Sequence, residues 1–127
     1  MSGSDPRASR ASDPTALVRG IRVALAATAD PRRAPAQQAY MKSAMPFLGV
    51  SVPDVRRITR AVATGEKDAA ALRAAAGTLW DEATHREHRY AAMQLLALRP
   101  NRGEPRLVPL VEHMVRTGRW WDITDEL

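Results

Sequence analysis

Six segments of the sequence carry apolar residues at helical spacing, and residues that start or stop a helix bound each of them. Asp13 followed by Pro14 is a typical start of the first helix, and Pro31 follows its end. Thr84 with Glu87 fits a capping box that would start the fifth helix. The pattern predicts helices over residues 15–29, 35–45, 53–65, 68–80, 84–98 and 105–117, and no strand.

These helices predict an all-α fold, and the many alanines and few β-branched runs agree with it. Six helices joined by short loops form antiparallel pairs with about 40 residues per pair, the period of HEAT-like repeats. The pairs are too dissimilar to define a repeat by identity, so an orthogonal bundle is the alternative. We expect one helical domain over residues 14–127, after a flexible tail over 1–13 that is too polar to offset the entropy of ordering.

The chain is basic, with a formal net charge of +5. Such a charge favours an anionic partner, and nucleic acid is the commonest one. Arginine outnumbers lysine and alanine is abundant, however, and a GC-rich coding bias would produce the same excess without any selection for DNA binding. Charge alone leaves both explanations open.

Several classes of protein are excluded or disfavoured. The chain has no cysteine, which excludes a disulfide framework and Cys-based zinc sites. It shows no signal peptide and no run of about 18 apolar residues, so we expect a cytoplasmic, nucleoid-associated protein that does not enter a membrane. His85 and His88 are three residues apart rather than four, and no third ligand is evident. We therefore expect no metal and no cofactor.

The stretch GRWWDITDEL, residues 118–127, is the strongest candidate for a site. On a helix, Trp121 and Asp125 would project from one face because they are four residues apart. An indole attracts cationic groups, and a carboxylate stabilises positive charge that develops in a transition state. Together they suit a cationic substrate. The alternative is an ordinary helix start, in which the tryptophan is buried in the core and the helix dipole favours the carboxylates of Asp122 and Asp125 near the N-terminus.

Three stretches resemble the DNA alkylation-repair glycosylases of the AlkD type. They are AYMKSAMPFLGVSVPDVRR (39–57), LWDEATHREHRYAAMQLL (79–96) and GRWWDITDEL (118–127), in this order and at these separations. Tyr-Met-Lys, four residues and then Phe-Leu-Gly form the most specific part. The region from about Leu17 to Leu127 is similar to the N-terminal half of such a protein.

The resemblance implies a right-handed superhelix of HEAT-like repeats whose basic concave face wraps duplex DNA. It implies release of N3- and N7-alkylated purines, without a metal and without base flipping. Asp125 matches the catalytic carboxylate, and Trp121 matches a tryptophan that contacts the lesion, with Trp120 beside it as a second substrate-binding residue. Tyr40 is assigned to packing.

Basic residues are the expected contacts to the DNA backbone. If they serve DNA, they should converge on one concave surface; the residues are Lys42, Arg56, Arg60, Arg89 and Arg119. A solvated helix face is the alternative for the arginines at 56, 57 and 60.

The family's second tryptophan and one DNA-contacting arginine belong to later repeats. We therefore expect an N-terminal fragment of a hydrolase, incomplete at its C-terminus, inactive alone and self-associating through the apolar face that a next repeat would cover. Whether the fragment itself is an enzyme stays open. The competing function is a non-catalytic HEAT-like scaffold that binds DNA or protein.

Overall fold

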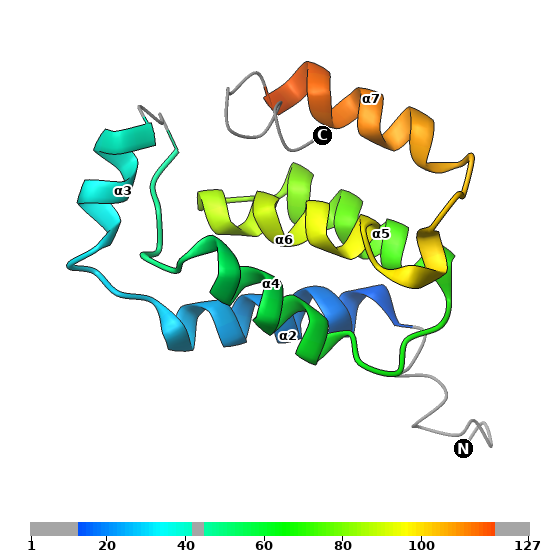
Figure 1. The fold of residues 1–127 in the computed structure, drawn as a ribbon, viewed down its shortest axis with the longest axis horizontal. Coiled ribbons are helices and arrows are strands. Elements are labelled where there is room, and N and C mark those ends of the chain that lie inside the picture. Colours follow the sequence, from blue (N-terminus) through cyan, green and yellow to red (C-terminus); the bar gives the residue numbers. More distant parts are fainter. Residues whose placement is uncertain (1–12, 42–44, 119–127) are drawn as a thin grey trace.

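The computed structural model describes residues 13–41 and 45–118, and all regular structure within them is helical (Figure 1). The helices are α2 (Pro14–Thr28), α3 (Ala34–Met41), α4 (Val52–Val62), α5 (Ala69–Asp81), α6 (Arg86–Leu96) and α7 (Leu107–Gly118), with a short 3-10 turn, η1 (Arg99–Asn101). No strand occurs in these ranges. Each predicted helix is therefore present, and the all-α class is confirmed.

Side chains at the helix starts explain where several helices begin. Asp13 accepts a hydrogen bond from the backbone N–H of Thr15 at 2.9 Å, which caps α2. Asp68 caps α5 in the same way, since its carboxylate accepts from the N–H groups of Ala70 and Ala71. Each cap satisfies a donor that the first helical turn leaves without a partner.

The predicted capping box at the start of α6 is wrong. His85, not Thr84, occupies the N-cap position, and its side chain makes no capping hydrogen bond. The carboxylate of Glu87 instead bonds to backbone N–H groups of residues 48–50. Glu87 therefore serves a tertiary contact that the local pattern does not reveal.

The helices stack in layers of pairs. In Figure 1, α2 and α4 run in opposite directions side by side, and α5 and α6 form the next layer. Between the layers α2 packs on α5 and α4 packs on α6, while α7 lies against α5 on the far side. The helix α3 stands at the side, between the ends of the layers. This stacking of helix pairs confirms the predicted HEAT-like class.

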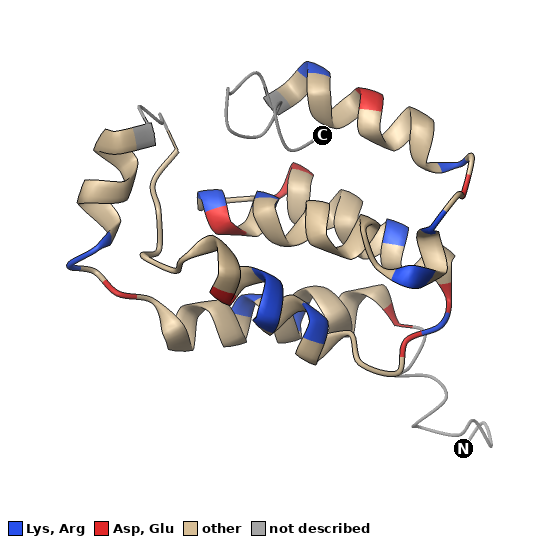
Figure 2. Cartoon of the chain, viewed as in Figure 1, with Lys and Arg blue, Asp and Glu red and all other residues tan. Residues whose placement is uncertain are grey.

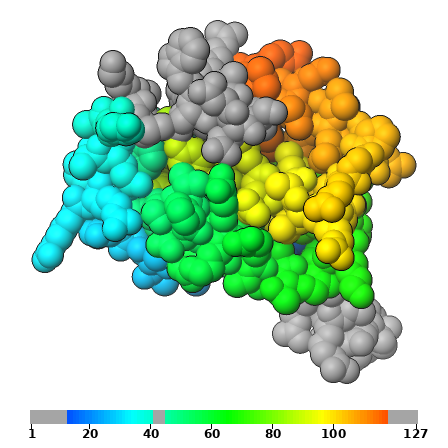
Figure 3. Space-filling model, in the orientation of Figure 1, coloured from blue at the N-terminus to red at the C-terminus, as the bar shows by residue number. Residues whose placement is uncertain are grey.

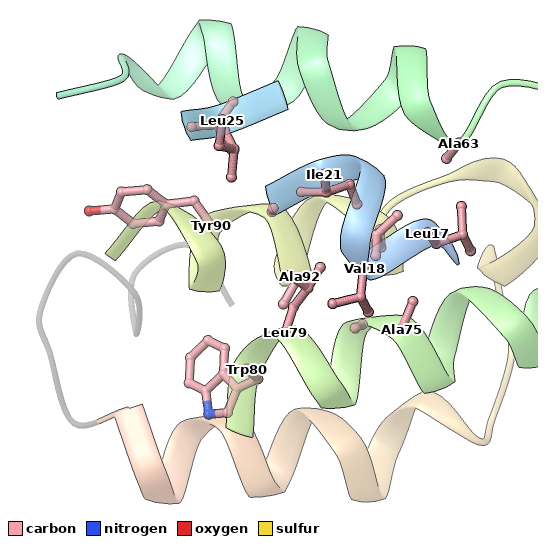
Figure 4. Packing of buried hydrophobic residues seen from close by; sticks show 14 of the residues in the cluster. Leu17, Val18, Ile21, Leu25, Ala63, Ala75, Leu79, Trp80, Tyr90 and Ala92 are labelled. Carbon is pink, nitrogen blue, oxygen red and sulfur yellow. The ribbon is translucent and has the colours of Figure 1, made fainter. Parts of the chain in front are cut away.

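The core lies between the two layers (Figure 4). Ile21 and Leu25 of α2 and Leu72 and Leu79 of α5 are fully buried and belong to one hydrophobic cluster. Alanines at positions 75, 76, 91 and 92 are also fully buried. Small side chains at a contact allow two helix axes to approach closely, which accounts for the tight packing of α5 on α6. None of the helices in the described ranges is long and apolar enough to span a bilayer.

Candidate nucleic-acid interface

A buried carboxylate fixes the irregular segment 45–51 that leads into α4. Glu87 of α6 is fully buried, and its two oxygens accept hydrogen bonds from the N–H groups of Leu48 at 2.9 Å, Gly49 at 3.0 Å and Val50 at 3.1 Å. Three successive N–H groups that face one anion form a nest. The start of α4, and with it the arginines of α4, is thereby tied to α6. Sequence reasoning missed this role of Glu87.

The same segment approaches the end of α2 so closely that only glycine fits at position 49. The N–H of Asp30 donates to the carbonyl of Leu48 at 3.0 Å. Gly49 has a φ of 94°, and a Cβ at this position would lie 2.0 Å from the carbonyl oxygen of Asp30. The glycine of the Phe-Leu-Gly signature therefore has a steric explanation.

Arg86 reinforces this segment from α6. Its backbone N–H donates to the carbonyl of Pro46 at 2.9 Å, and its side chain is fully buried. The guanidinium lies 5.9 Å from the ring centroid of Phe47 and 5.8 Å from that of Tyr90. Burial lowers the pKa of Arg86 from its ordinary value. The two aromatic rings are thus held together by a cation between α6 and the loop.

His88, the next buried residue of α6, is a neutral packing residue. Burial lowers its pKa to about 4, and the positive charges of Arg22 and His85 add to the effect. Its Nδ1 accepts a hydrogen bond from the N–H of Thr84 at 3.3 Å, which requires the unprotonated nitrogen. Within the described part of the chain no group of three or more His, Asp or Glu residues is arranged to hold a metal ion.

A groove of about 920 Å³ opens between α3, α4, α6 and α7, and its walls are mostly apolar. Parts of all four helices are visible in the view of Figure 3. Aromatic and aliphatic side chains form most of the lining, and Gln37, Gln94 and Arg56 supply polar groups; the lining residues are Ala36, Gln37, Tyr40, Phe47, Val52, Val55, Arg56, Tyr90, Met93, Gln94, Leu96, Ala97, Leu107 and Val111.

Tyr40 lies at the border of this groove and is 85% exposed. The assignment of Tyr40 to packing is therefore wrong. The helix α3 is only eight residues long, and none of its described side chains is fully buried. A short helix at the margin leaves its aromatic side chain available to a ligand in the groove.

The structure brings two of the predicted basic residues together. Arg56 and Arg60 are exposed on α4, one helical turn apart, and Arg56 lines the groove. Figure 2 marks the arginine positions along α4 in blue. Arg57 instead donates to the carboxylate of Asp54 at 3.2 Å, and this bond lowers the pKa of Asp54. Arg57 is thus held by a neighbour on its own helix, and Arg56 is the arginine of α4 that lines the groove.

Arg89 has a different environment. It is half-buried on α6, and its guanidinium lies 4.6 Å from the ring centroid of Trp80 on α5. Burial lowers its pKa. Arg89 does not belong to the groove lining. The other predicted site residues lie outside the described residues: Lys42, Arg119, Trp120, Trp121 and Asp125.

Comparison with known proteins gives one match. A family model described as DNA alkylation repair enzyme matches residues 21–127, which include every groove-lining residue and the Trp-Trp-Asp stretch. No curated protein and no solved structure gives a significant match. The family model covers all of the sequence except its first 20 residues. The chain therefore belongs to the family of DNA alkylation repair enzymes.

Proposed function

We propose that this chain carries the catalytic motif of a DNA glycosylase that removes cationic N3- and N7-alkylated purines from duplex DNA without base flipping. The family match carries the proposal, because residues 21–127 include the motif with Trp121 and Asp125. DNA alkylation repair needs an enzyme that distinguishes a cationic base from neutral ones. A carboxylate next to an indole is suited to that distinction.

The proposed reaction needs little from the protein beyond charge and position. An alkylated purine is cationic and already a good leaving group, so the glycosidic bond breaks with positive charge developing on the sugar. The carboxylate of Asp125 stabilises this oxocarbenium-like state or orients the water that traps it. Trp121 lies against the deoxyribose or the cationic base in this mechanism.

The groove supports the proposal through its composition. Its apolar wall and the exposed ring of Tyr40 suit the apolar face of a deoxyribose at the surface of the duplex. Arg56 and Arg60 on the adjoining helix suit backbone phosphates, which fix the register of a duplex without reading its sequence. At α4 an apolar surface for the sugar therefore lies next to basic side chains for the phosphates.

Excision of 7-methylguanine from duplex DNA under single-turnover conditions tests the proposal. The assay uses residues 1–127 and the same residues continued by the later repeats of a family member, because the resemblance places further site residues there. We expect excision by the extended protein, and we expect Asp125→Asn to reduce it by a factor of about 10² to 10³ while lesion binding stays within about twofold. Asp122→Asn is the matched control. Undiminished excision by Asp125→Asn would refute the assigned role.

Duplex binding without any excision would favour the non-catalytic scaffold. The salt dependence of binding then tests the basic surface itself. Each phosphate contact contributes about one unit to the slope of log affinity against log salt. We expect Arg56→Ala with Arg60→Ala to lower this slope by about two, and Arg57→Ala to lower it by less than about one because Arg57 is paired with Asp54. An unchanged slope would support the coding-bias explanation of the net charge.

We further propose that the chain self-associates through α7. Val108 and Val115 of α7 are 57% and 40% exposed. Exposed apolar side chains on one helix favour contacts between molecules. Sedimentation of the wild type and of Val108→Ser with Val115→Ser tests this; equal monomer fractions in both would contradict it.

A further inference from the structure

Two glutamine amides in the groove between α3, α4, α6 and α7 have unused hydrogen-bonding atoms. Gln37 of α3 and Gln94 of α6 belong to its lining. The oxygen Oε1 of Gln37 is buried and accepts no hydrogen bond from the described residues. The amide of Gln94 is half-buried and makes no side-chain hydrogen bond within the same ranges. Buried acceptors without a partner are rare and lower the stability of a fold, so such atoms on a cavity wall indicate a ligand.

The orientation of the Gln37 amide is fixed by its nitrogen. Nε2 of Gln37 donates to the backbone carbonyl of Val50 at 3.3 Å. A carbonyl oxygen can only accept, so the nitrogen of the amide must face Val50 and the oxygen is the atom left over. Val50 is itself held, because its N–H donates to the carboxylate of Glu87 at 3.1 Å. The groove therefore has a fixed acceptor, which suits a ligand with an N–H or O–H donor.

The charges around the groove are mainly positive. Arg56 lines it, and none of the described lining residues is acidic. Behind the lining, the buried guanidinium of Arg86 lies 5.9 Å from the ring centroid of Phe47 and 5.8 Å from that of Tyr90. The carboxylate of Glu87, next to it in the sequence, already accepts three N–H bonds. A cationic ligand would be repelled in this groove, whereas a neutral ligand would not.

The size and the walls of the groove suit a planar molecule. Its volume of about 920 Å³ lies within the range of about 300 to 1,000 Å³ that is usual for small-ligand sites. The rings of Tyr40, Phe47 and Tyr90 form part of the lining beside aliphatic side chains. An unpaired nucleobase stacks on such rings. A paired base stays inside its duplex, so a groove whose acceptor is buried suits a free base instead.

We propose that the groove binds a free, neutral purine base through Gln37 and Gln94. Oε1 of Gln37 accepts from an N–H of the base, the amide of Gln94 bonds to a second polar atom at its edge, and the aromatic rings contact its face. An alkylated purine is cationic in DNA, but it leaves with the electron pair of the glycosidic bond and is then neutral. The groove thus suits the base after excision and disfavours the cationic base before it. This inference goes beyond the proposed function, since binding of a free base does not require this chain to cleave the bond.

Two methylxanthines separate the hydrogen bond from stacking. Theophylline and caffeine are neutral purines of nearly the same shape, and theophylline has an N–H where caffeine carries a methyl group. NMR titration of the isotope-labelled chain measures both affinities, since a ligand of this size binds with a Kd on the order of 0.1 to 1 mM. We expect theophylline to bind about threefold to tenfold more tightly, with shifts at the groove lining. Equal affinities, shifts elsewhere or no saturable shift would overturn the proposal.

A third and a fourth ligand test the charge. 3-Methyladenine, the neutral base released from an N3-alkylated site, should bind about as tightly as theophylline. The aromatic cation 1-methylnicotinamide also carries N–H donors, and we expect it to bind at least about tenfold more weakly because of the surrounding positive charge. Equal binding of the cation would overturn the selection for a neutral base.

Gln37→Met and Gln94→Met test the two amides, because methionine has nearly the length of glutamine but lacks its polar atoms. We expect Gln37→Met to weaken theophylline binding about threefold to tenfold and to leave caffeine within about twofold. Gln94→Met keeps the Gln37 bond to Val50 intact and should weaken both ligands. The matched control is Gln38→Met, next along α3 but outside the groove lining, with no change expected. Unchanged binding in both groove variants, or equal losses in all three, would overturn the proposal. Excision is scored separately: theophylline binding without excision supports this inference and counts against the proposed function, and excision without such binding does the reverse.

Discussion

The centre of the molecule and the margins of its groove are built differently. In α5 and α6 whole faces are buried, with Leu72, Leu79 and Leu95 inaccessible to solvent. In α3 none of the described side chains is fully buried, and in α7 Met114 is the one that is. Burial of a large apolar side chain contributes about 1.5 to 3 kcal/mol, so most of the stability resides in the centre. The margins are therefore free to carry residues chosen for a ligand, such as Tyr40.

The segment 45–51 belongs to the centre although it has no regular structure. Its backbone is held by Glu87, Arg86 and Asp30, which come from α6 and from the end of α2. The backbone N–H groups of this loop donate to a buried carboxylate, as those of a helix donate to its carbonyl groups, so the backbone of the loop is also held in one conformation. Whether a residue belongs to the stable centre therefore depends on its buried contacts and hydrogen bonds, and not on whether it lies in a helix.

The largest expected effect is at Glu87. Glu87→Ala leaves the N–H groups of Leu48, Gly49 and Val50 without their acceptor, and we expect a loss of about 4 kcal/mol in the free energy of unfolding. Urea denaturation measures it. The matched control is Glu112→Ala on the exposed face of α7, with an expected change below about 0.5 kcal/mol. Similar losses of unfolding free energy in both variants would contradict the conclusion that the centre is more important for stability than the margins.

Substitution of Gly49 is expected to rank second. Gly49→Ala combines a positive φ with a clash against the carbonyl of Asp30, and we expect a loss of about 3 kcal/mol or more. Gly65 also has a positive φ, 87°, but a Cβ there meets nothing within 4 Å. Gly65→Ala should therefore lose only about 1 to 2 kcal/mol, the cost of the backbone conformation. Equal losses would show that segment 45–51 moves to relieve the clash.

The buried His88 gives the centre a pH dependence. Its folded-state pKa of about 4 lies below the ordinary value of 6.5, so the unfolded chain binds the proton first as the pH falls. The stability that depends on neutral His88 is complete above about pH 6.5 and is lost toward pH 4, by about 2 to 3 kcal/mol. The difference in unfolding free energy between wild type and His88→Phe should shrink or reverse over this window. A constant difference would contradict the assignment.

The smallest effect on stability is expected at the margin. Tyr40→Ala removes a side chain that is 85% exposed, so the free energy of unfolding should change by less than about 0.5 kcal/mol. Contact of the ring with a deoxyribose buries apolar surface, which contributes about 25 cal/mol per Å², so duplex affinity should fall by about fivefold. Val23→Ala on α2, where Val23 is 64% exposed, is the control for both measurements. Unchanged affinity would remove Tyr40 from the interface.

Sequence patterns predicted those parts of the fold that depend on neighbours along the chain. The spacing of Ile21 and Leu25 and the cap at Asp13 are local signals, and the structure bears them out. Glu87 could not be assigned in this way, because it fits a local capping pattern while its real partners lie 37 to 39 residues earlier. The assignment of Tyr40 to packing was wrong for a related reason. The exposure of Tyr40 depends on where α3 lies relative to the other helices, and the eight residues of α3 do not determine that.

The candidate site was predicted in part. Arg56 and Arg60 were expected on one helix face and are found there beside the groove, whereas the stacking of Arg89 on Trp80 depends on the packing of α5 against α6. The motif with Trp121 and Asp125 stays a prediction that rests on the family. A family pattern identifies which residues react; it does not show what holds them in place.

Segment 45–51 also limits how the protein can be altered. Irregular segments usually accept insertions and substitutions, and protein engineers choose them for tags and grafts. Here a proline at position 48, 49 or 50 removes a donor that Glu87 uses, and a single inserted residue shifts all three donors out of register. Saturation mutagenesis should therefore rank these positions with the buried faces of α5 and α6. The short helix α3, although regular, should tolerate substitution with a smaller loss of stability.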